Sequence, residues 1–448
     1  MFSFTDPNRE KAFLPKWFDK PAPADSVRSL FASSDDVPQT PGARLYGFFK
    51  KRFDLTDESF SSSKADYCLD RLPELPVTKL PESVLDELRA AVGPDGVSVS
   101  SADRIRAVPA LTSRDVEIIR KRDFTCAPEA VIYPREPGQI KKIASVCRSH
   151  ALSIAMPDFL ILPEKPDVSV ALSRGMKKLV SFAEKDLSVT VLAGAGAYSL
   201  EGVLNRARTV LDASHNYTLG ENLPLFGNPS VGRLLADGVP EDERRFENAA
   251  LFEADLRIRR FTPETRRYFC VFFRDRNSSR NAADELMCSG LNGLHLTVFD
   301  ENMTGLLLSL IPSSVGSHSV YTKAALIGYV DGPSAYTRGS RKSVFEICSA
   351  FSGRPFLPAF AERLFDSRPH LAEYRDAFED FGLHACLFRT SLPFSGSGMR
   401  QTSIMGALPD DPGLFAGSFL SFFDDGSAEL NVLLCSPKYH PRELEDLI

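Results

Sequence analysis

Few residues in this sequence have both the type and the spacing that chemistry requires. Three histidines, His370, His384 and His440, stand apart from one another, and a lone histidine is more often a packed or surface residue than a base. The eight cysteines are widely separated and contain no Cys-x-x-Cys pair, so we expect reduced, mostly buried thiols. The sequence has neither the motif order of a Ser/His/Asp catalytic triad nor a Walker-type phosphate-binding loop. The residue types alone predict no metal site and leave the catalytic residues unknown.

Two glycine-containing segments have some features of ligand-binding turns. Gly194 and Gly196 lie in the run AGAGA, but a GxG pair without a third glycine or a later acidic residue is a weak signal, which a turn at a strand end explains equally well. The run from Phe394 to Ser403 holds three serines and two glycines beside Arg400. It could form an anion-binding nest or a plain connection between strands.

Composition excludes some classes of function. Of the 448 residues, 43% are hydrophobic and 25% are charged, which is typical of a globular protein of about two or three domains. The formal net charge of -6 argues against nucleic-acid binding, because the phosphate backbone requires a clustered excess of Lys and Arg. No apolar stretch has the length of a signal peptide or of a membrane span. We therefore expect a cytoplasmic protein.

Composition and the pattern of helical and β-rich runs divide the chain into three parts. Residues 1–105 are rich in Pro, Ser and Asp and contain only short helical pieces, so we expect an N-terminal arm. One such piece, residues 43–53, has an apolar face that should pack on the main body or on a partner. That face is formed by Leu45, Phe48, Phe49 and Phe53.

From about residue 123, short β-rich runs alternate with amphipathic helices. A helix over 136–152 should begin at Glu136 and Pro137, because proline is tolerated in a first helical turn. Its inward face holds Ile140, Ile143, Ala144 and Cys147. Strands are expected at 130–135, 152–157, 168–174 and 187–197. Strand, helix and strand in this order indicate an α/β sheet.

A third sequence pattern begins near residue 308. Two helical segments, 341–351 and 358–365, lie among β-rich runs, so we expect an α+β domain with an antiparallel sheet. Its strands are expected at 324–332, 384–394, 418–426 and 428–436. Eight arginines between residues 257 and 280 have acidic neighbours, a pattern typical of a solvated face or an interdomain contact. A phosphate or carboxylate site is the alternative for this cluster.

Residues 128–238 resemble the flavin-binding domain of the vanillyl-alcohol-oxidase and p-cresol-methylhydroxylase family, which includes D-lactate and glycolate oxidising enzymes and alkyldihydroxyacetonephosphate synthase. The runs that carry the resemblance appear in the family's order: PEAVIYPREPGQIKKIASVCRSHALSIAMP, VSVALSRGMKKLVSFAEKDLSVTVLAGAGAYSLEGVL, YTLG and NPSVGRLLADG. The resemblance implies two α/β subdomains with flavin adenine dinucleotide (FAD) between them. A partial match at 288–312 implies that 294–299 and 304–312 are late strands of the same domain.

The same resemblance implies where FAD should bind. Ser230 and Gly232 match the segment near the flavin, whereas Arg233 stands where the family has a second glycine. Arg233 could form a structural ion pair or offer a compensating charge to a phosphate. Pro157 and Gly194 lie at the strand ends that should face the cofactor. The family holds the pyrophosphate in a glycine-rich loop, yet residues 158–165 read DFLILPEK, with no glycine and two carboxylates. We therefore expect a degenerate pyrophosphate loop, because bulky apolar side chains cannot form a nest of backbone amides.

These observations predict an α+β protein with a two-subdomain FAD-binding fold of the vanillyl-alcohol-oxidase type and a C-terminal α+β cap. The expected domains are an arm (1–105), the FAD-binding-type domain (106–310) and the cap (311–448). The resemblance implies a flavin-dependent oxidase or dehydrogenase of a small hydroxy acid. A non-catalytic homologue, serving as an accessory subunit beside a flavoprotein or an iron-sulfur partner, is the alternative.

Overall fold

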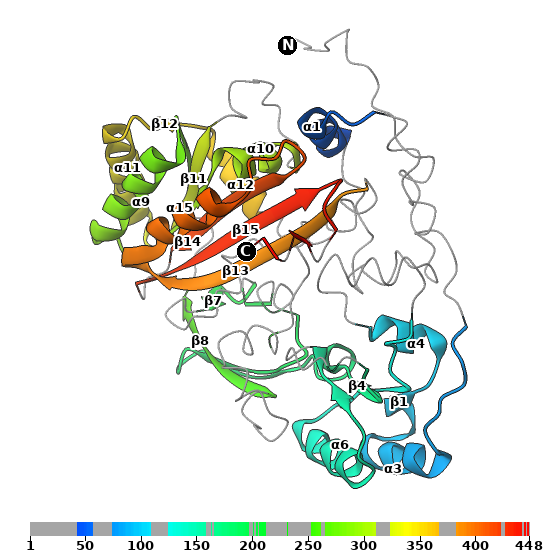
Figure 1. The fold of residues 1–448 in the computed structure, drawn as a ribbon. Coiled ribbons are helices and arrows are strands. Elements are labelled where there is room, and N and C mark those ends of the chain that lie inside the picture. Colours follow the sequence, from blue (N-terminus) through cyan, green and yellow to red (C-terminus); the bar gives the residue numbers. More distant parts are fainter. Residues whose placement is uncertain are drawn as a thin grey trace.

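Three separate β-sheets organise the described part of the chain. The structure, a computed structural model, describes residues 43–56, 74–108, 124–157, 163, 165–196, 200, 203–204, 206–211, 231, 252–260, 265–310, 323–366, 382–422, 426–440, 443–444 and 446–447. Figure 1 shows the first small sheet at one end of the molecule, the seven-stranded sheet at the other, and a second small sheet between them.

The first sheet has the order β1-β2-β4-β3, in which β2, β4 and β3 run parallel and β1 is antiparallel. Its strands are β1 (Val97–Ser98), β2 (Ala130–Ile132), β3 (Ile154–Ala155) and β4 (Val168–Val170). The helices of this unit are α3 (Glu82–Val92), α4 (Ser101–Arg106) and α6 (Pro137–Ser149), with a 3-10 turn, η3 (Pro94–Gly96). The expected strand, helix and strand are thus confirmed.

Helix α6 forms for the reasons visible in its sequence. Pro137 occupies the first helical position, and Glu136 and Gln139 form a reciprocal capping box that satisfies backbone amides of the first turn. Ile140, Ile143 and Cys147 are buried against α3. Residues 82–105, expected as part of the arm, belong to this unit, because α3 packs on α6 and β1 pairs with β2.

The second sheet is antiparallel, with the order β5-β6-β8-β7. It comprises β5 (Leu179–Ala183), β6 (Ser188–Leu192), β7 (Thr209–Leu211) and β8 (Glu253–Arg260), preceded by a 3-10 turn, η5 (Leu172–Arg174). One side of β6 and β8 buries Val189, Val191, Leu256 and Ile258 together with Leu204. The alternation of buried and exposed residues along β8 is that of a strand with one face in a core.

The third sheet is antiparallel, with the order β12-β9-β11-β10-β14-β15-β13. Its strands are β9 (Arg267–Phe273), β10 (Leu294–Phe299), β11 (Ala324–Val330), β12 (Arg354–Pro355), β13 (His384–Pro393), β14 (Phe415–Phe422) and β15 (Ser427–Ser436). Its helical elements are α9 (Arg276–Cys288), α10 (Glu301–Leu310), α11 (Ser334–Ala350), α12 (Pro358–Asp366) and α15 (Ser397–Ala407), with a 3-10 turn, η10 (Phe394–Gly396). The expected antiparallel α+β unit is confirmed.

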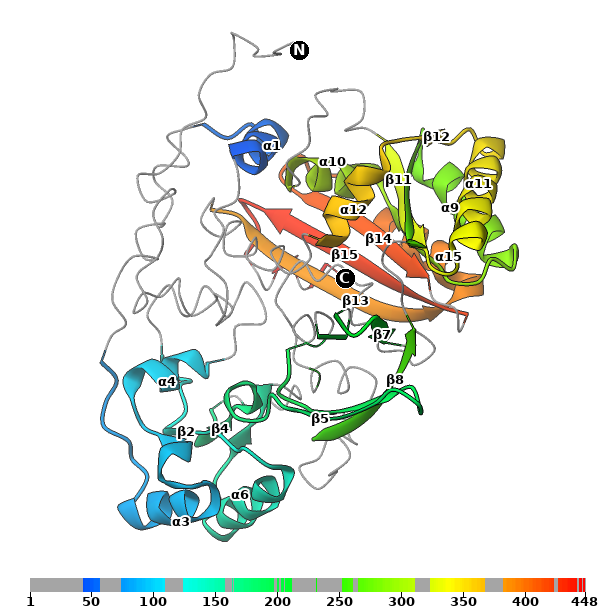
Figure 2. The ribbon, with the colours of Figure 1, turned by 180° about the vertical axis from the view of Figure 1, so that it is seen from behind.

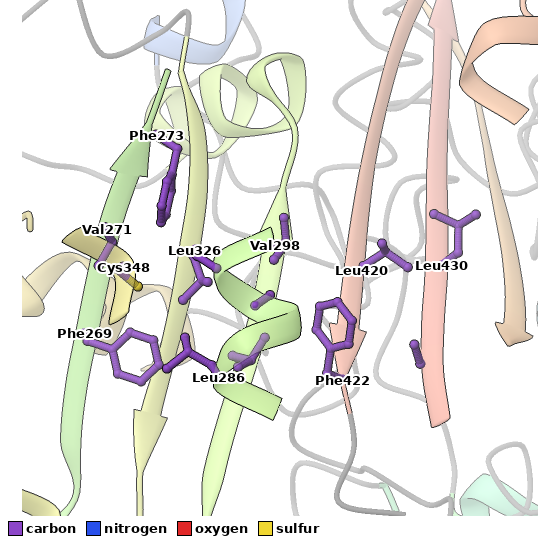
Figure 3. Close-up of a cluster of buried hydrophobic side chains, with 14 of the residues drawn as sticks. Phe269, Val271, Phe273, Leu286, Val298, Leu326, Cys348, Leu420, Phe422 and Leu430 are labelled. Carbon is purple, nitrogen blue, oxygen red and sulfur yellow. The ribbon is translucent and has the colours of Figure 1, made fainter. Parts of the chain in front are cut away.

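Both faces of this sheet are apolar over most of their area. On one face, α9, α11 and α15 cover a cluster that includes Phe269, Leu326 and Phe422 (Figure 3). On the other face, α10 and α12 pack with α1 (Ala43–Phe53) over Phe299 and Phe415. Figure 2 shows α1, α10 and α12 on the same side of the long strands.

The structure corrects two expectations for residues 294–312: the sheet to which the first strand belongs, and the presence of a second strand. Residues 294–299 do form a strand, but β10 pairs with β11 and β14 of the seven-stranded sheet. The expected strand at 304–312 is wrong, because residues 301–310 form helix α10. The domain boundary expected at residue 310 thus falls within one sheet, and the topology favours a boundary between β8 and β9.

Helix α1 packs on the main body, as one of the two alternatives predicted. Phe49 is fully buried, its ring stacks on Phe53, and it meets Phe415 edge-on. Arg52 donates hydrogen bonds to the backbone carbonyls of Pro412 and Leu414. The side chain of Leu45 lies outside the described residues. In the part of the chain that the structure describes, no helix has the length and apolar composition to cross a membrane.

Candidate functional site

The carboxyl ends of three parallel strands form one edge of the first sheet. Since β2 and β3 both pair in parallel with β4, the residues that follow them, Tyr133, Met156 and Ala171, lie along the same edge. In open sheets of parallel strands, ligands bind in the crevice outside this edge. Pro157, the next residue after Met156, is half-buried there.

The turn that follows β4 lies against two other backbone segments. A Cβ atom at Gly175 would come within 2.2 Å of the carbonyl oxygen of Pro134, just beyond β2. A Cβ atom at Gly194, just beyond β6, would come equally close, at 2.2 Å, to the carbonyl oxygen of Leu172. Only glycine permits such approaches. The turn of residues 172–176 is therefore wedged between the first sheet and the end of β6, which makes it the junction of the two small sheets.

One more segment reaches this junction. The backbone N–H of Val231 donates a hydrogen bond to the carbonyl oxygen of Ala195, at 2.8 Å. The Val231 side chain is buried beside Val189, Val191 and Leu204. Residue 231 is thus fixed next to the turn that contains Gly194.

Arg174 occupies the middle of the junction turn. Its guanidinium carbon lies 4.5 Å from the centre of the Tyr133 ring, and its Nη1 atom lies 3.6 Å from the carboxylate of Asp103. Burial, followed by the charge of Asp103, raises the pKa of Tyr133 to about 12, so the phenol stays protonated at neutral pH. The Arg174 side chain is 62% exposed. The junction therefore carries an accessible cation over a neutral aromatic ring.

A second group of polar side chains connects β8 to the seven-stranded sheet. Arg259 donates through Nη2 to Asp331 at 3.0 Å and lies 3.1 Å from Nε2 of His295. Arg266 donates to both carboxylate oxygens of Asp331, at 2.7 and 2.8 Å. Burial would raise the pKa of Asp331, but the hydrogen bond and charge of Arg266 and the charge of Arg259 hold it below its usual range. The carboxylate is therefore ionised at neutral pH.

Aromatic rings enclose one side of this group. His295 and Tyr329 are direct cross-strand partners, and their ring centres lie 4.5 Å apart. The Arg266 guanidinium lies 3.8 Å from the centre of the Tyr329 ring, a close cation-π contact. Tyr329 and His295 are both buried, whereas Arg259 keeps 29% of its side chain exposed. Solvent thus reaches the group from the Arg259 side.

Solved structures of other proteins have folds similar to this one. An alkyldihydroxyacetonephosphate synthase superposes with a TM-score of 0.68 at 16% identity, covering 93% of this chain and 86% of that chain. p-Cresol methylhydroxylase with substrate bound has a TM-score of 0.57 at 13% identity, with coverages of 82% and 84%. A 4-ethylphenol oxidase from Gulosibacter chungangensis, in an isoeugenol complex, gives 0.56 at 10% identity, with coverages of 82% and 85%. No protein-family model and no curated protein matches the sequence.

This chain has the vanillyl-alcohol-oxidase-type flavoprotein fold. The expected two subdomains with a C-terminal α+β cap are therefore confirmed, and so is the resemblance stated from the sequence. We call the two small sheets together the FAD-binding-type half of the molecule, and the seven-stranded sheet with its helices the cap.

The structure describes two of the residues predicted to face FAD. Pro157 lies at the carboxyl edge of the first sheet, and Gly194 lies at the junction turn. Ser230, Gly232 and Arg233 lie outside the described residues, although Val231, between the first two, contacts the same junction. Most of the loop expected to be degenerate, residues 158–162 and 164, also lies outside them.

Sequence reasoning missed the polar group around His295 and the role of the junction turn. Arg259 lies 36 positions before His295 and 72 positions before Asp331 in the chain. The three residues meet only through strand pairing. The arginine-rich stretch did indicate an interdomain contact, and Arg259 makes one. Two histidines read as isolated, His384 and His440, stack with ring centres 5.7 Å apart.

Proposed function

We propose that this chain is an FAD-binding oxidoreductase that acts on a small hydroxy acid or a similar substrate. The observation that supports the proposal is the junction turn of residues 172–176. It joins the carboxyl edge of a parallel sheet to the second sheet, the place where a flavoprotein fold of this type should accept its dinucleotide.

Two described residues of the junction are our candidates for contact with the cofactor. We expect Pro157 and Gly194 to contact the dinucleotide through their backbones, since neither has a charged or long side chain. Ser230, Gly232 and Arg233 would complete the site from the segment around Val231, and Arg233 would add a positive charge. When bound, FAD supplies the acceptor for a hydride from a substrate C–H bond.

The group around His295 would serve the substrate. Arg259 is fixed by Asp331 and remains partly exposed, so its guanidinium can hold a carboxylate. His295 lies beside it and can take the hydroxyl proton at Nε2 once the substrate displaces the Arg259 contact. Tyr329 packs against the imidazole and limits its rotation. This arrangement favours a 2-hydroxy acid over a neutral alcohol.

Flavin content tests the proposal directly. The purified protein should show the yellow absorbance of oxidised flavin, either as isolated or after incubation with FAD and removal of the free cofactor. Substrates such as lactate and glycolate should then bleach the flavin under anaerobic conditions. Protein that stays colourless after incubation with FAD would contradict the proposal.

A non-catalytic role remains the second candidate. It is favoured by the absence of glycine between Asp158 and Lys165, where the pyrophosphate loop of an active relative is expected. In this case the chain would be an accessory subunit beside an active flavoprotein or an iron-sulfur protein. Purification of the native complex from its own source, followed by flavin and iron analysis of the co-purifying chains, separates this role from the first.

A further inference from the structure

The junction turn carries a charged group, Arg174, that belongs to one of the runs carrying the family resemblance but is not among the residues predicted to bind FAD. Arg174 follows the carboxyl end of β4 and precedes Gly175, whose missing Cβ lets the turn touch Pro134. On the other side, Leu172 of the same turn touches Gly194. The backbone of Arg174 is therefore fixed between the two sheets, at the carboxyl edge where a dinucleotide would lie.

The Arg174 side chain is oriented but accessible. The Tyr133 ring supports it on one side, and Asp103 attracts it at 3.6 Å. Asp103 is itself held on α4, where its backbone N–H donates to Ser100. More than half of the Arg174 side chain nevertheless faces solvent, at 62% exposure. Such a contact with Asp103 is weak, on the order of 1 kcal/mol or less, so a ligand with two negative charges can compete for the guanidinium.

The sequence around the expected phosphate loop creates a need for such a cation. Two phosphates require compensation, either from converging backbone amides or from a charged side chain. Residues 158–165 offer no glycine for an amide nest and contain Asp158 and Glu164. A guanidinium at the same edge can replace the nest, because its planar donors fit phosphate oxygens in pairs.

We infer that Arg174 binds the pyrophosphate of the dinucleotide in place of the missing glycine nest. Tyr133 and Asp103 act as positioning residues that keep the guanidinium at the carboxyl edge before the ligand arrives. This inference rests on the proposed function, since it names a residue of the same cofactor site. It also assigns an ADP-like anion, and not only FAD, as the chemistry recognised there.

Binding measurements on Arg174→Gln test the inference. Flavin fluorescence titrations with FAD and with riboflavin, which lacks both phosphates, should be made on the wild type and the variant. FAD affinity should fall about 10-fold to 100-fold, the loss expected for a charge-assisted hydrogen bond, while riboflavin affinity stays unchanged. Arg174→Lys should recover part of the FAD affinity. Equal FAD affinity in wild type and Arg174→Gln, or an equal loss for both ligands, would overturn the inference.

Two controls keep the result interpretable. Arg400→Gln removes an exposed arginine on α15, in the cap, and should leave both affinities unchanged. Thermal-shift measurements with ADP probe the anion site without flavin. If the wild type binds ADP but not FAD, the proposed function fails while loss of ADP stabilisation in Arg174→Gln still supports the inference. If the wild type binds neither ligand, both are overturned.

Discussion

Arg259 on β8 and Asp331 at the end of β11 form a 3.0 Å ion pair that joins the FAD-binding-type half of the molecule to the cap. Arg266 completes the arrangement with a two-pronged contact to the same carboxylate. Asp331 is only 6% exposed. A buried carboxylate with two arginines is a demanding arrangement, because removal of one partner leaves the remaining charges without compensation in a poorly solvated place.

Asp331→Asn should therefore destabilise the protein strongly. The variant keeps the size of the side chain but leaves Arg259 and Arg266 without their anion, at an expected cost of about 3 kcal/mol. Chemical denaturation measures the loss. The matched control is Glu346→Gln, which removes an exposed pair with Lys342 on α11 and should cost less than about 1 kcal/mol. Similar losses in the two variants would show that the pair at Asp331 is not buried as described.

Asp300 makes the stability of the folded protein depend on pH. Its buried carboxylate accepts hydrogen bonds from the N–H of Met303 and from the N–H and hydroxyl of Ser418, yet burial raises its pKa to about 6. Since an unfolded Asp has a pKa of about 3.9, the folded state holds this proton more tightly. The contribution of Asp300 to stability should fall as pH rises from about 4 to about 6.

Asp300→Asn isolates this effect. The variant is less stable than the wild type at low pH, because the amide nitrogen faces the N–H of Ser418 and cannot accept its hydrogen bond. As pH rises from about 4 to about 7, only the wild type ionises, so the difference in stability should narrow by roughly 2–3 kcal/mol. Unfolding curves across this pH range measure the difference. A difference that stays constant would mean that the pKa of Asp300 is not raised.

Gly194 should tolerate no side chain. Gly194→Ala places a methyl group 2.2 Å from the carbonyl oxygen of Leu172, a distance that only movement of the backbone can relieve. We expect a loss of stability of about 2 kcal/mol and, under the proposed function, weaker FAD binding. Thermal unfolding and FAD titration check the two effects. In the control Gly339→Ala, on α11, the new Cβ meets nothing within 4 Å, and helix propensity predicts a gain of about 0.5–1 kcal/mol.

The sequence predicted the elements whose signals are local. Helix α6 was predicted because the proline, the capping residues and the apolar spacing all lie within one segment. Helix α10 was misread as a strand because the partial family match was extended over residues 304–312, where a run of leucines does not by itself distinguish a buried strand from a helix. A start signal was nevertheless present: the side chain of Asp300 accepts the N–H of Met303, as an N-cap residue does.

The candidate site could be predicted only where the chain resembles a known pattern. Gly194 was identified from such a pattern, but the reason for the glycine, contact with Leu172, requires the packing of two units. The contact of Arg259 with His295 depends on which strands pair and in which register. Antiparallel pairing between distant strands has no local signal, so composition and periodicity could not place these residues together.

Phe49 tests whether α1 is an integral part of the cap. Its ring is fully buried between Phe53 and Phe415, so Phe49→Ala should leave a cavity and cost about 3 kcal/mol. The control Leu357→Ala removes a side chain that is 57% exposed and should change stability by less than about 0.5 kcal/mol. Thermal unfolding compares the two variants. If Phe49→Ala unfolds at the wild-type temperature, α1 contributes nothing to the stability of the cap. If the variant unfolds at a lower temperature, the helix is part of the fold, because the seven-stranded sheet needs α1 to cover Phe415 and its neighbours.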